Sequence, residues 1–328
     1  MDVQLAKPHH TAEGFRNNYP HPPRASYWAW RLERRRKGLP KIPAGGWHFP
    51  LDKPDVGFLK GNRWEPTVTW VGHATVLLQL GGLNILTDPH FTHRASPVPF
   101  AGPARVVAPA LAFDELPHID IVLVSHNHYD HLDLRSVTRL AAQAHGPPRF
   151  YVPLGLKRWF RNVGIEVAAE MDWWQASADG ALVIHCVPAQ HWSARTPWDR
   201  NRTLWSGFVV EHPCFRFIYT GDTGYSQDFR DIQRRFGFFD LAAMPIGAYE
   251  PRWFMGAQHI NPQEAVRMHQ ELCARQSLAV HWGTFMLTDE PLDEPPSKLA
   301  EAMRAAQLPQ DAFWVFRHGE TRRLALRK

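Results

Sequence analysis

The chain has 328 residues, 44% of them hydrophobic and 21% charged, which is the composition of an ordinary globular protein of enzyme size. No run approaches the roughly 18 consecutive apolar residues of a membrane-spanning helix, and the N-terminus lacks the apolar core of a secretion signal. Three scattered cysteines without a CxxC pair exclude a disulfide framework, so we expect a cytoplasmic protein with free thiols. The net charge of +5 fits an anionic partner such as a phosphate, a nucleic acid or an acidic lipid surface, without choosing among them.

The first 64 residues are rich in Pro, His and Arg, and we interpret residues 1–64 as an N-terminal arm or cap that packs on a core domain, residues 65–328. Within the arm, "SYWAWRLERRRKGLP" places aromatic residues before a basic run. This order is typical of a short helix on a membrane surface, and equally of a solvated helix with a packed aromatic end. Both interpretations stay open.

From Thr67 onward the pattern changes to short apolar runs separated by turn residues. The run 67–80, then Gly81-Gly82, then "LNILTDP" predicts two strands joined by a two-residue hairpin turn. Further strands are predicted at 119–125, 149–153, 181–188, 207–221, 239–247 and 277–283, and helices at 132–144, 226–237 and 261–276. Strands followed by mixed strands and helices favour an α/β protein in which helices cover the sheets.

Four apolar runs end in the same way, with potential metal ligands at or just beyond the strand end. "IVLVS" leads into "HNHYDH", and the other three lead into one ligand each. Side chains at the rim of a sheet can converge on one cleft. The candidate ligands are His126, His128, Asp130, His131, His191, Asp222 and His281.

These residues exceed what one tetrahedral ion can use, whereas two ions bridged by one carboxylate use all seven. Imidazole and carboxylate suit zinc, with iron or manganese as alternatives, and the lack of clustered thiols argues against a closed structural zinc site. Two divalent ions, two aspartates and a bridging hydroxide leave the site positive, which favours an anionic substrate. Because paired ions can hold the attacking and leaving oxygens, phosphodiester hydrolysis fits best, with lactone or amide hydrolysis as alternatives.

Three further residues are candidates for supporting roles. Asp88, in "LTDP", could accept the free N–H of a metal-bound histidine and fix its tautomer. His73, in "GHAT", could serve similarly or be a structural turn residue. His259, in "QHINP", could donate a proton or a hydrogen bond to the leaving oxygen.

The motifs "HNHYDH" and "GDT", with His191 and His281, resemble the metallo-β-lactamase superfamily. The longer strings "TWVGHATVLL", "LTDPHFTHRASP", "PIGAYEPRWFM" and "AVHWGTF" are similar to the N-acyl-phosphatidylethanolamine-hydrolysing phospholipase D family, and the likeness covers roughly residues 67–325. The resemblance implies an αββα sandwich, with two mixed sheets flanked by helices and a dinuclear zinc site at one edge of the sheets.

The resemblance also implies a division of the ligands. His126, His128 and His191 would hold one zinc, Asp130, His131 and His281 the other, and Asp222 both. A bridging hydroxide would attack the phosphodiester of N-acyl-phosphatidylethanolamine, with Asp130 orienting or deprotonating it, and phosphatidic acid and an N-acylethanolamine would be released. Six aromatic residues are expected to line an acyl groove or membrane-facing surface, with core packing as the alternative for any one of them: Tyr129, Trp173, Trp174, Tyr249, Trp253 and Phe254.

Three other functions remain as alternatives. A hydrolase of the same fold could act on a nucleic-acid phosphodiester, but the positive charge is concentrated in the arm, so we expect no nucleic-acid partner. A di-iron oxidoreductase would be expected to have glutamate where this chain has His128. A non-catalytic lipid-binding module is disfavoured because all the ligand positions are filled. We expect transient contact with the inner membrane face through the arm, and leave a homodimer open.

Overall fold

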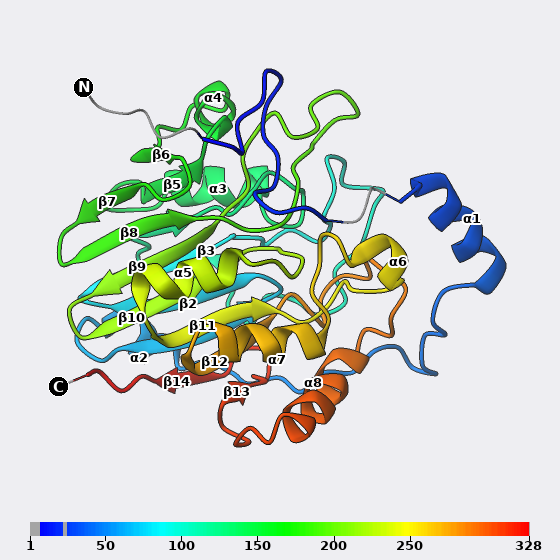
Figure 1. Cartoon of the computed structure of the whole chain (residues 1–328). Coiled ribbons are helices and arrows are strands. Elements are labelled where there is room, and N and C mark those ends of the chain that lie inside the picture. Colours follow the sequence, from blue (N-terminus) through cyan, green and yellow to red (C-terminus); the bar gives the residue numbers. More distant parts are fainter. Residues whose placement is uncertain (1–6, 22–24, 328) are drawn as a thin grey trace.

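The computed structural model describes residues 7–21 and 25–327. Two seven-stranded sheets pack face to face, and helices cover their outer faces (Figure 1). The strand orders are β14-β1-β2-β3-β4-β5-β6 in the first sheet and β13-β12-β11-β10-β9-β8-β7 in the second. The αββα sandwich expected from the sequence is confirmed.

The first sheet is built from β1 (Thr67–Gly72), β2 (Thr75–Leu80), β3 (Leu83–Thr87), β4 (Ile121–Leu123), β5 (Arg149–Pro153), β6 (Ala169–Met171) and β14 (Thr321–Arg323). The second consists of β7 (Ala176–Asp179), β8 (Leu182–Val187), β9 (Gly207–His212), β10 (Phe215–Tyr219), β11 (Phe239–Pro245), β12 (Ala274–Val280) and β13 (Phe313–Trp314). The helices are α1 (Tyr27–Lys37), α2 (Val56–Gly61), α3 (Leu134–Ala141), α4 (Leu156–Asn162), α5 (Asp228–Phe236), α6 (Arg252–Met255), α7 (Pro262–Glu271) and α8 (Glu294–Ala305), with a 3-10 turn at Phe113–Glu115.

Strand direction brings several strand ends to one edge of the sandwich. In the first sheet β1 and β2 pair antiparallel, as do β2 and β3, while β3, β4, β5 and β6 are parallel. The second sheet repeats this arrangement, antiparallel from β8 to β10 and parallel from β10 to β13. It follows that β1, β3 and β4 share one direction, and so do β8, β10 and β12.

The core follows the period of two that a strand imposes on its side chains. Leu78 and Leu123 pack between the two sheets, whereas Leu77 and Val122 belong to a second cluster beneath α2, α3 and α4. Helices α5, α7 and α8 add residues such as Phe229 to the cluster of the second sheet. Both faces of each central strand are therefore buried, as expected for a sheet covered on both sides.

The glycine hairpin predicted from the sequence is confirmed. β2 and β3 pair antiparallel, and Gly81 and Gly82 between them have φ angles of 60° and 78°. A two-residue turn with positive φ at both positions matches the twist of the flanking strands, and glycine adopts it without steric cost.

The prediction of one strand over residues 67–80 is wrong. The chain breaks at His73, which has a φ of 53°, and β1 turns back to pair with β2. The run 207–221 is likewise two strands, β9 and β10, separated by Pro213 and Cys214. The apolar run continues through the break at His73 because β1 and β2 are both buried, so hydrophobicity alone cannot mark that turn. At the second break, Glu211, His212 and Pro213 interrupt the apolar run and mark the turn.

The helix predicted over 261–276 ends at Glu271, and its last residues belong to β12. The start is as expected, with Asn261 accepting a hydrogen bond from the Glu264 N–H and a reciprocal bond completing a capping box. Cys273, at a φ of 50°, turns the chain into the strand. The 12-residue helix α8 and the short elements α2, α4, α6, β6, β7, β13 and β14 were not anticipated.

Residues 7–21 run across one end of the sandwich, and α1 projects at its side (Figure 1). Trp30 of α1 is buried, its ring stacks on Phe254 at 4.9 Å, and its indole N–H donates to Asp289. Parts of the arm, residues 1–6 and 22–24, lie outside the described residues. Among the helices of residues 7–21 and 25–327, none is long and apolar enough to cross a membrane.

Candidate metal centre

Six strands deliver polar side chains to the same edge of the sandwich. In the first sheet β1 leads to His73, β3 to Asp88, and β4 to the segment 125–131. In the second sheet β8 leads to His191, β10 to Asp222 and β12 to His281. These residues all follow the carboxyl ends of strands that share a direction within their sheet, which explains why residues so far apart in the sequence meet.

One cluster consists of three imidazoles. His126 Nε2 lies 2.8 Å from His128 Nδ1, and His191 Nε2 lies 3.2 Å from the same atom. Their ligand atoms all lie within 4.8 Å of one another. Burial lowers the pKa of His126 and His128 well below the usual value and that of His191 to about 4, so these rings are neutral at pH 7 and present lone pairs.

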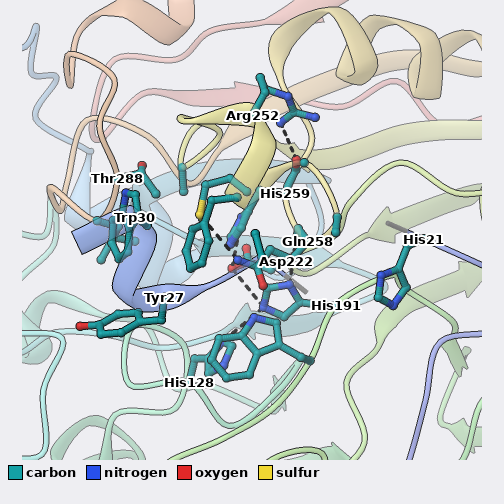
Figure 2. Close-up of a pocket in the computed structure, with 18 of the residues that line it drawn as sticks. His21, Tyr27, Trp30, His128, His191, Asp222, Arg252, Gln258, His259 and Thr288 are labelled. Atoms are coloured by element: carbon teal, nitrogen blue, oxygen red, sulfur yellow. Dashed lines mark hydrogen bonds and ion pairs between the residues drawn. The ribbon is translucent and has the colours of Figure 1, made fainter. Parts of the chain in front are cut away.

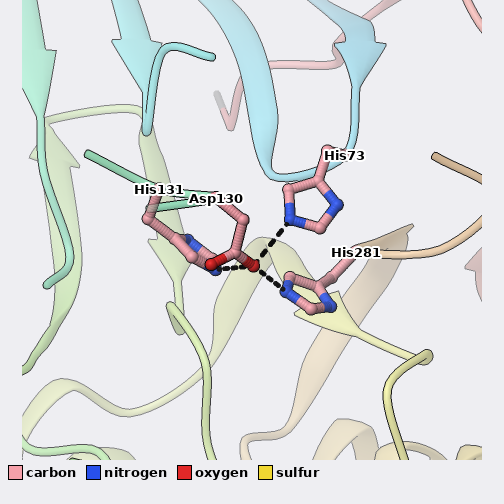
Figure 3. Close-up of side chains that lie close together, drawn as sticks. All are labelled: His73, Asp130, His131 and His281. Carbon is pink, nitrogen blue, oxygen red and sulfur yellow. Dashed lines mark hydrogen bonds and ion pairs between the residues drawn. The ribbon is translucent and has the colours of Figure 1, made fainter. Parts of the chain in front are cut away.

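A second cluster surrounds the carboxylate of Asp130 (Figure 3). Asp130 Oδ2 lies 3.2 Å from His131 Nε2, 3.2 Å from His281 Nε2 and 3.1 Å from His73 Nε2. His73 also packs its ring on His281, with centroids 4.1 Å apart. His73 could therefore be a metal ligand itself, or it could hold the carboxylate of Asp130 in place by a hydrogen bond.

Asp222 lies between the two clusters. Its Oδ2 atom is 3.0 Å from His131 Nε2 and 3.2 Å from His281 Nε2 in the second cluster, and 3.9 Å from His191 Nε2 in the first. A carboxylate in this position can reach an ion held by either cluster.

Hydrogen bonds behind the ligands fix which imidazole nitrogen is free. Asp88 accepts from His131 Nδ1 at 2.6 Å, and also from the N–H and the hydroxyl of Ser125 and the hydroxyl of Tyr219. The carbonyl of Gln258 accepts from His191 Nδ1 at 2.9 Å. Because a carboxylate and a carbonyl can only accept, both Nδ1 atoms carry the proton, and Nε2 of each ring faces the centre.

The charge balance of the site fits divalent ions. Asp130 and Asp222 are buried, and within the described part of the chain their ion-pair partners are histidines. Burial opposes ionisation of both carboxyl groups, but the charge of His131 and the further interactions with neighbouring histidines together outweigh it and hold both pKa values well below the usual range. In turn, burial lowers the pKa of His281, but the charge of Asp222 and the hydrogen bonds to Asp130 and Asp222 together outweigh that effect and raise it to about 9.

Without metal, the protonated rings of His131 and His281 therefore supply the positive charge that balances the carboxylates of Asp130 and Asp222. Bound cations would supply that charge and would accept the lone pairs of the deprotonated rings. The clusters are consistent with a dinuclear metal site, with nitrogen and oxygen as the only donor atoms.

A cavity of about 560 Å³ opens onto this centre. Figure 2 shows His128, His191 and Asp222 within it, together with Tyr27 and Trp30 of α1. Further lining residues come from α6 and from the segment after it, and include Trp253, Phe254, Met255, Gln258 and His259. The cavity therefore joins a polar floor to an apolar wall, as small-molecule sites commonly do.

The other residues predicted to contact substrate fall into two sets. Tyr129 and Trp253 line the cavity, as does His259, whose Nδ1 lies 3.9 Å from Asp222 Oδ2. Trp173, Trp174 and Tyr249 are not among the residues that line it. Their side chains have structural partners.

The Trp173 indole donates to the Trp205 carbonyl, and its ring stacks on His9. Trp174 lies beneath the guanidinium of Arg235, at 5.3 Å from the ring centroid. The Tyr249 hydroxyl donates to Glu294 at 2.5 Å. Core packing, the ordinary role of large aromatic residues, thus accounts for these three side chains.

Arg195 is a site residue that the sequence analysis missed. Its Nη1 donates to the carbonyls of Asn127 and Leu132, both at 2.8 Å, and its guanidinium lies 3.9 Å above the ring of Tyr129. Arg195 thereby holds both ends of the loop that contains four candidate ligands. The only signal in the sequence was its position four residues after His191.

Comparisons with known proteins agree with the fold and with the ligand clusters. The family model described as the β-lactamase superfamily domain matches residues 83–282. N-acyl-phosphatidylethanolamine-hydrolyzing phospholipase D 1 of Caenorhabditis elegans is 45% identical over 258 residues, which cover 75% of this chain and 72% of that protein. The mitochondrial N-acyl-phosphatidylethanolamine-hydrolyzing phospholipase D of Saccharomyces cerevisiae is 39% identical over 251 residues, 73% of this chain and 52% of the yeast protein.

Among solved structures, an isothiocyanate hydrolase from Delia radicum gut bacteria superposes with a TM-score of 0.62. The likeness covers 78% of this chain and 98% of that one at 20% identity, so it supports the fold alone.

The fold, the clustered ligands and the matched domain define a metallohydrolase of the metallo-β-lactamase superfamily. Within that superfamily the chain belongs to the family that contains the N-acyl-phosphatidylethanolamine-hydrolysing phospholipases D.

Proposed function

We propose that this protein is a dizinc phosphodiesterase of the phospholipase D type, which hydrolyses N-acyl-phosphatidylethanolamine or a related phosphodiester. The cavity is the observation that supports this function best, because it places an apolar wall opposite two clusters of metal ligands. A phosphodiester with an acyl chain matches both parts, since its phosphate can face the metal ligands and its hydrocarbon chain the apolar wall. The two relatives named for this activity support the same substrate class.

Each metal ion has a proposed set of ligands. One zinc would be held by His126, His128 and His191, the other by Asp130, His131 and His281, and Asp222 would reach both. Two such ions supply Lewis acidity at a phosphate and lower the pKa of water to near neutrality. Nitrogen and oxygen donors suit zinc, with iron and manganese as the competing ions.

The chain's own residues would orient the reactants. Asp130 is proposed to orient the attacking water and accept its proton. The water oxygen then bonds to phosphorus, and the bond from phosphorus to the ethanolamine oxygen breaks. The leaving oxygen takes up a proton, which balances the one given to Asp130, and phosphatidic acid and an N-acylethanolamine are released. Burial lowers the pKa of His259 to about 3, so this residue would act as a neutral hydrogen-bond donor to the leaving oxygen.

The apolar wall would bind the hydrocarbon next to the reacting phosphate. Tyr27 and Trp30 contribute to it from α1, Trp253 and Phe254 contribute from α6, and Tyr129 lies beside the metal ligands. Trp30 stacks on Phe254 at an interplanar angle of 12°, which closes the wall between the two helices. The guanidinium of Arg252 donates to the His259 carbonyl and to the Glu264 carboxylate, and these bonds hold α6 against the start of α7.

The outer face of α1 fits a lipid surface. Trp28 is 78% exposed, Leu32 and Leu39 are exposed as well, and the basic residues Arg31 and Arg35 lie among them. Apolar and basic side chains together bind anionic bilayers through burial and charge. The proposal therefore places the protein in the cytoplasm, with transient contact at the inner membrane face. It includes no nucleic-acid partner, and it leaves a homodimer open.

The proposed function is tested by metal analysis of the purified protein together with an assay for N-acylethanolamine release from N-acyl-phosphatidylethanolamine vesicles. We expect about two zinc ions per chain, turnover that stops when a chelator removes them, and loss of turnover in Asp222→Asn. Asp240→Asn is a matched control, because Asp240 is also a buried aspartate but accepts from the Arg216 N–H on β10. It should retain activity.

Other outcomes would change the assignment. Two zinc ions without turnover of this lipid would keep the metallohydrolase and discard the substrate, and other phosphodiesters and lactones would be assayed next. Two iron ions would indicate the oxidoreductase alternative. A protein that binds no metal would overturn the mechanism.

A further inference from the structure

The N-terminal segment from Lys7 to His21 lies outside the matched domain, yet it contacts the metal centre. Its first anchor is Asp172, which accepts from Lys7 at 2.5 Å, from His9 at 2.7 Å and from His10 at 2.9 Å. Asp172 is 1% exposed, so these contacts hold the segment to a buried carboxylate. The segment then turns at residues 11–14 and runs toward His191.

The turn is in close contact with the loop that follows His191. The Phe15 N–H donates to the Asn201 carbonyl at 2.8 Å. Gly14 has a φ of 153°, and a Cβ atom built on it would lie 2.1 Å from the same carbonyl oxygen. Only glycine can approach the Asn201 carbonyl this closely, so the arm packs tightly against this loop.

Asn17 then contacts the main chain of a metal ligand on both sides. Its Oδ1 accepts from the His191 N–H at 3.1 Å and from the Trp205 indole at 3.0 Å. Its Nδ2 donates to the His191 carbonyl at 3.1 Å. One side-chain amide thus makes the pair of hydrogen bonds that a neighbouring strand would make in an antiparallel ladder.

His191 needs such a partner because β8 ends at Val187, four residues before it. The preceding residue, Gln190, still bonds to Thr223 and Gly224 of the second sheet. Beyond it, within the described part of the chain, the main-chain N–H and carbonyl of His191 bond to Asn17 alone. Asn17 and the Gln258 carbonyl therefore fix the backbone and the ring of this ligand together.

We propose that Asn17 is a positioning residue of the metal centre, which holds the main chain of His191 so that Nε2 faces the ion of the cluster His126, His128 and His191. The inference rests on the metal centre of the proposed function and is independent of the lipid substrate. It makes the N-terminal arm a structural part of the active site.

The test compares Asn17→Ala with Asn18→Ala by chelator competition for zinc in the full-length protein. Asn18 is the matched control, since its side chain anchors the same arm by donating to Asp228 of α5 and, within the described part of the chain, makes no hydrogen bond to a proposed ligand. Partners behind metal ligands change affinity by roughly 10–100-fold. We expect a weakening of that size for one of the two ions in Asn17→Ala, with the other ion and both ions of Asn18→Ala unchanged.

Asn17→Asp is a third variant of nearly the same size. It keeps the acceptor for the His191 N–H but places an oxygen against the His191 carbonyl, so its zinc affinity should be no better than that of Asn17→Ala. If the alanine variant fails to fold, the aspartate variant decides the question.

Wild-type affinity for both ions in a folded Asn17 variant would overturn the positioning role while leaving the proposed function intact. Equal weakening in the Asn17 and Asn18 variants would also overturn it, since the effect would then come from docking of the arm as a whole. A wild-type protein that binds no zinc would instead remove the metal centre and the proposed function with it.

Discussion

Gly221 separates the end of β10 from the carboxylate of Asp222 and has no room for a side chain. Its φ is +61°, and a Cβ atom there would lie 2.7 Å from the Ser206 carbonyl and 2.8 Å from Ser125 Cβ. Ser125 in turn lies beside His126 and bonds to Asp88. The loop after β4 in the first sheet can therefore lie this close to β10 of the second sheet only because residue 221 is glycine.

We expect Gly221→Ala to lower the free energy of unfolding and to reduce the metal content. Gly180→Ala is its control, because Gly180 has the same φ of +61° but no atom within 4 Å of the added Cβ. Both variants have the strain of a positive φ, and overpacking should cost Gly221→Ala roughly 1–3 kcal/mol more. Equal effects of the two variants in urea unfolding would contradict this explanation.

Single residues differ in how far the sequence predicts their role. The seven candidate ligands were singled out because each follows an apolar run, and this local pattern can be read without a fold. Asn17 could not be recognised, since its partner His191 is 174 positions away and no pattern links them. Trp173 and Trp174 were expected in an acyl groove, but the direction of a side chain in a turn depends on backbone angles, such as the φ of 72° at Trp174.

At the scale of elements, Arg195 connects two loops that belong to different sheets. It lies in the loop after β8 and donates to carbonyls at both ends of the loop after β4. We expect Arg195→Ala to lower the free energy of unfolding by roughly 1.5–3 kcal/mol, the usual contribution of hydrogen bonds to a charged group. Lysine should restore only part of this loss, because it has no planar group to stack on Tyr129.

Urea unfolding of both Arg195 variants measures this effect. Arg202→Ala is the control from the same loop, since Arg202 donates to the Trp198 carbonyl at the surface. It should change the free energy of unfolding by no more than about 0.5 kcal/mol. Full recovery of stability by lysine at position 195 would refute the role of stacking.

The sequence predicts the elements better than their ends. The Gly81-Gly82 turn and the start of α7 were recognised because they depend on local chemistry, namely positive φ and a capping box. The break at His73 lies inside an apolar run and depends on pairing between strands, whereas the break at Pro213 has a local signal that the prediction did not use. The short helices and edge strands were missed because so few residues carry too little periodic signal.

At the scale of the whole molecule, the anchor of the arm should respond to acid. Burial would raise the pKa of Asp172, but hydrogen bonds from His9, Lys7 and His10 outweigh it and lower this pKa below the usual range. A depressed carboxyl pKa stabilises the folded state above the unfolded value of about 3.9, and the contribution is lost as the pH falls through the folded value.

We therefore expect the wild type to be more stable than Asp172→Asn by a margin that is complete at about pH 5 and shrinks below about pH 4. Urea unfolding at a series of pH values measures that margin. A margin that grows on acidification would show that the carboxylate is not the group that anchors the arm.

The division of the ligands between the sheets has a consequence for how the protein is assembled. Each cluster takes ligands from the loop after β4 in the first sheet and one histidine from the second, His191 or His281. Neither sheet alone can therefore complete a site, and an ion can be gripped only when the sandwich has closed. We therefore expect metal to bind only after the two sheets have packed together, and bound ions would then link the two halves of the sandwich.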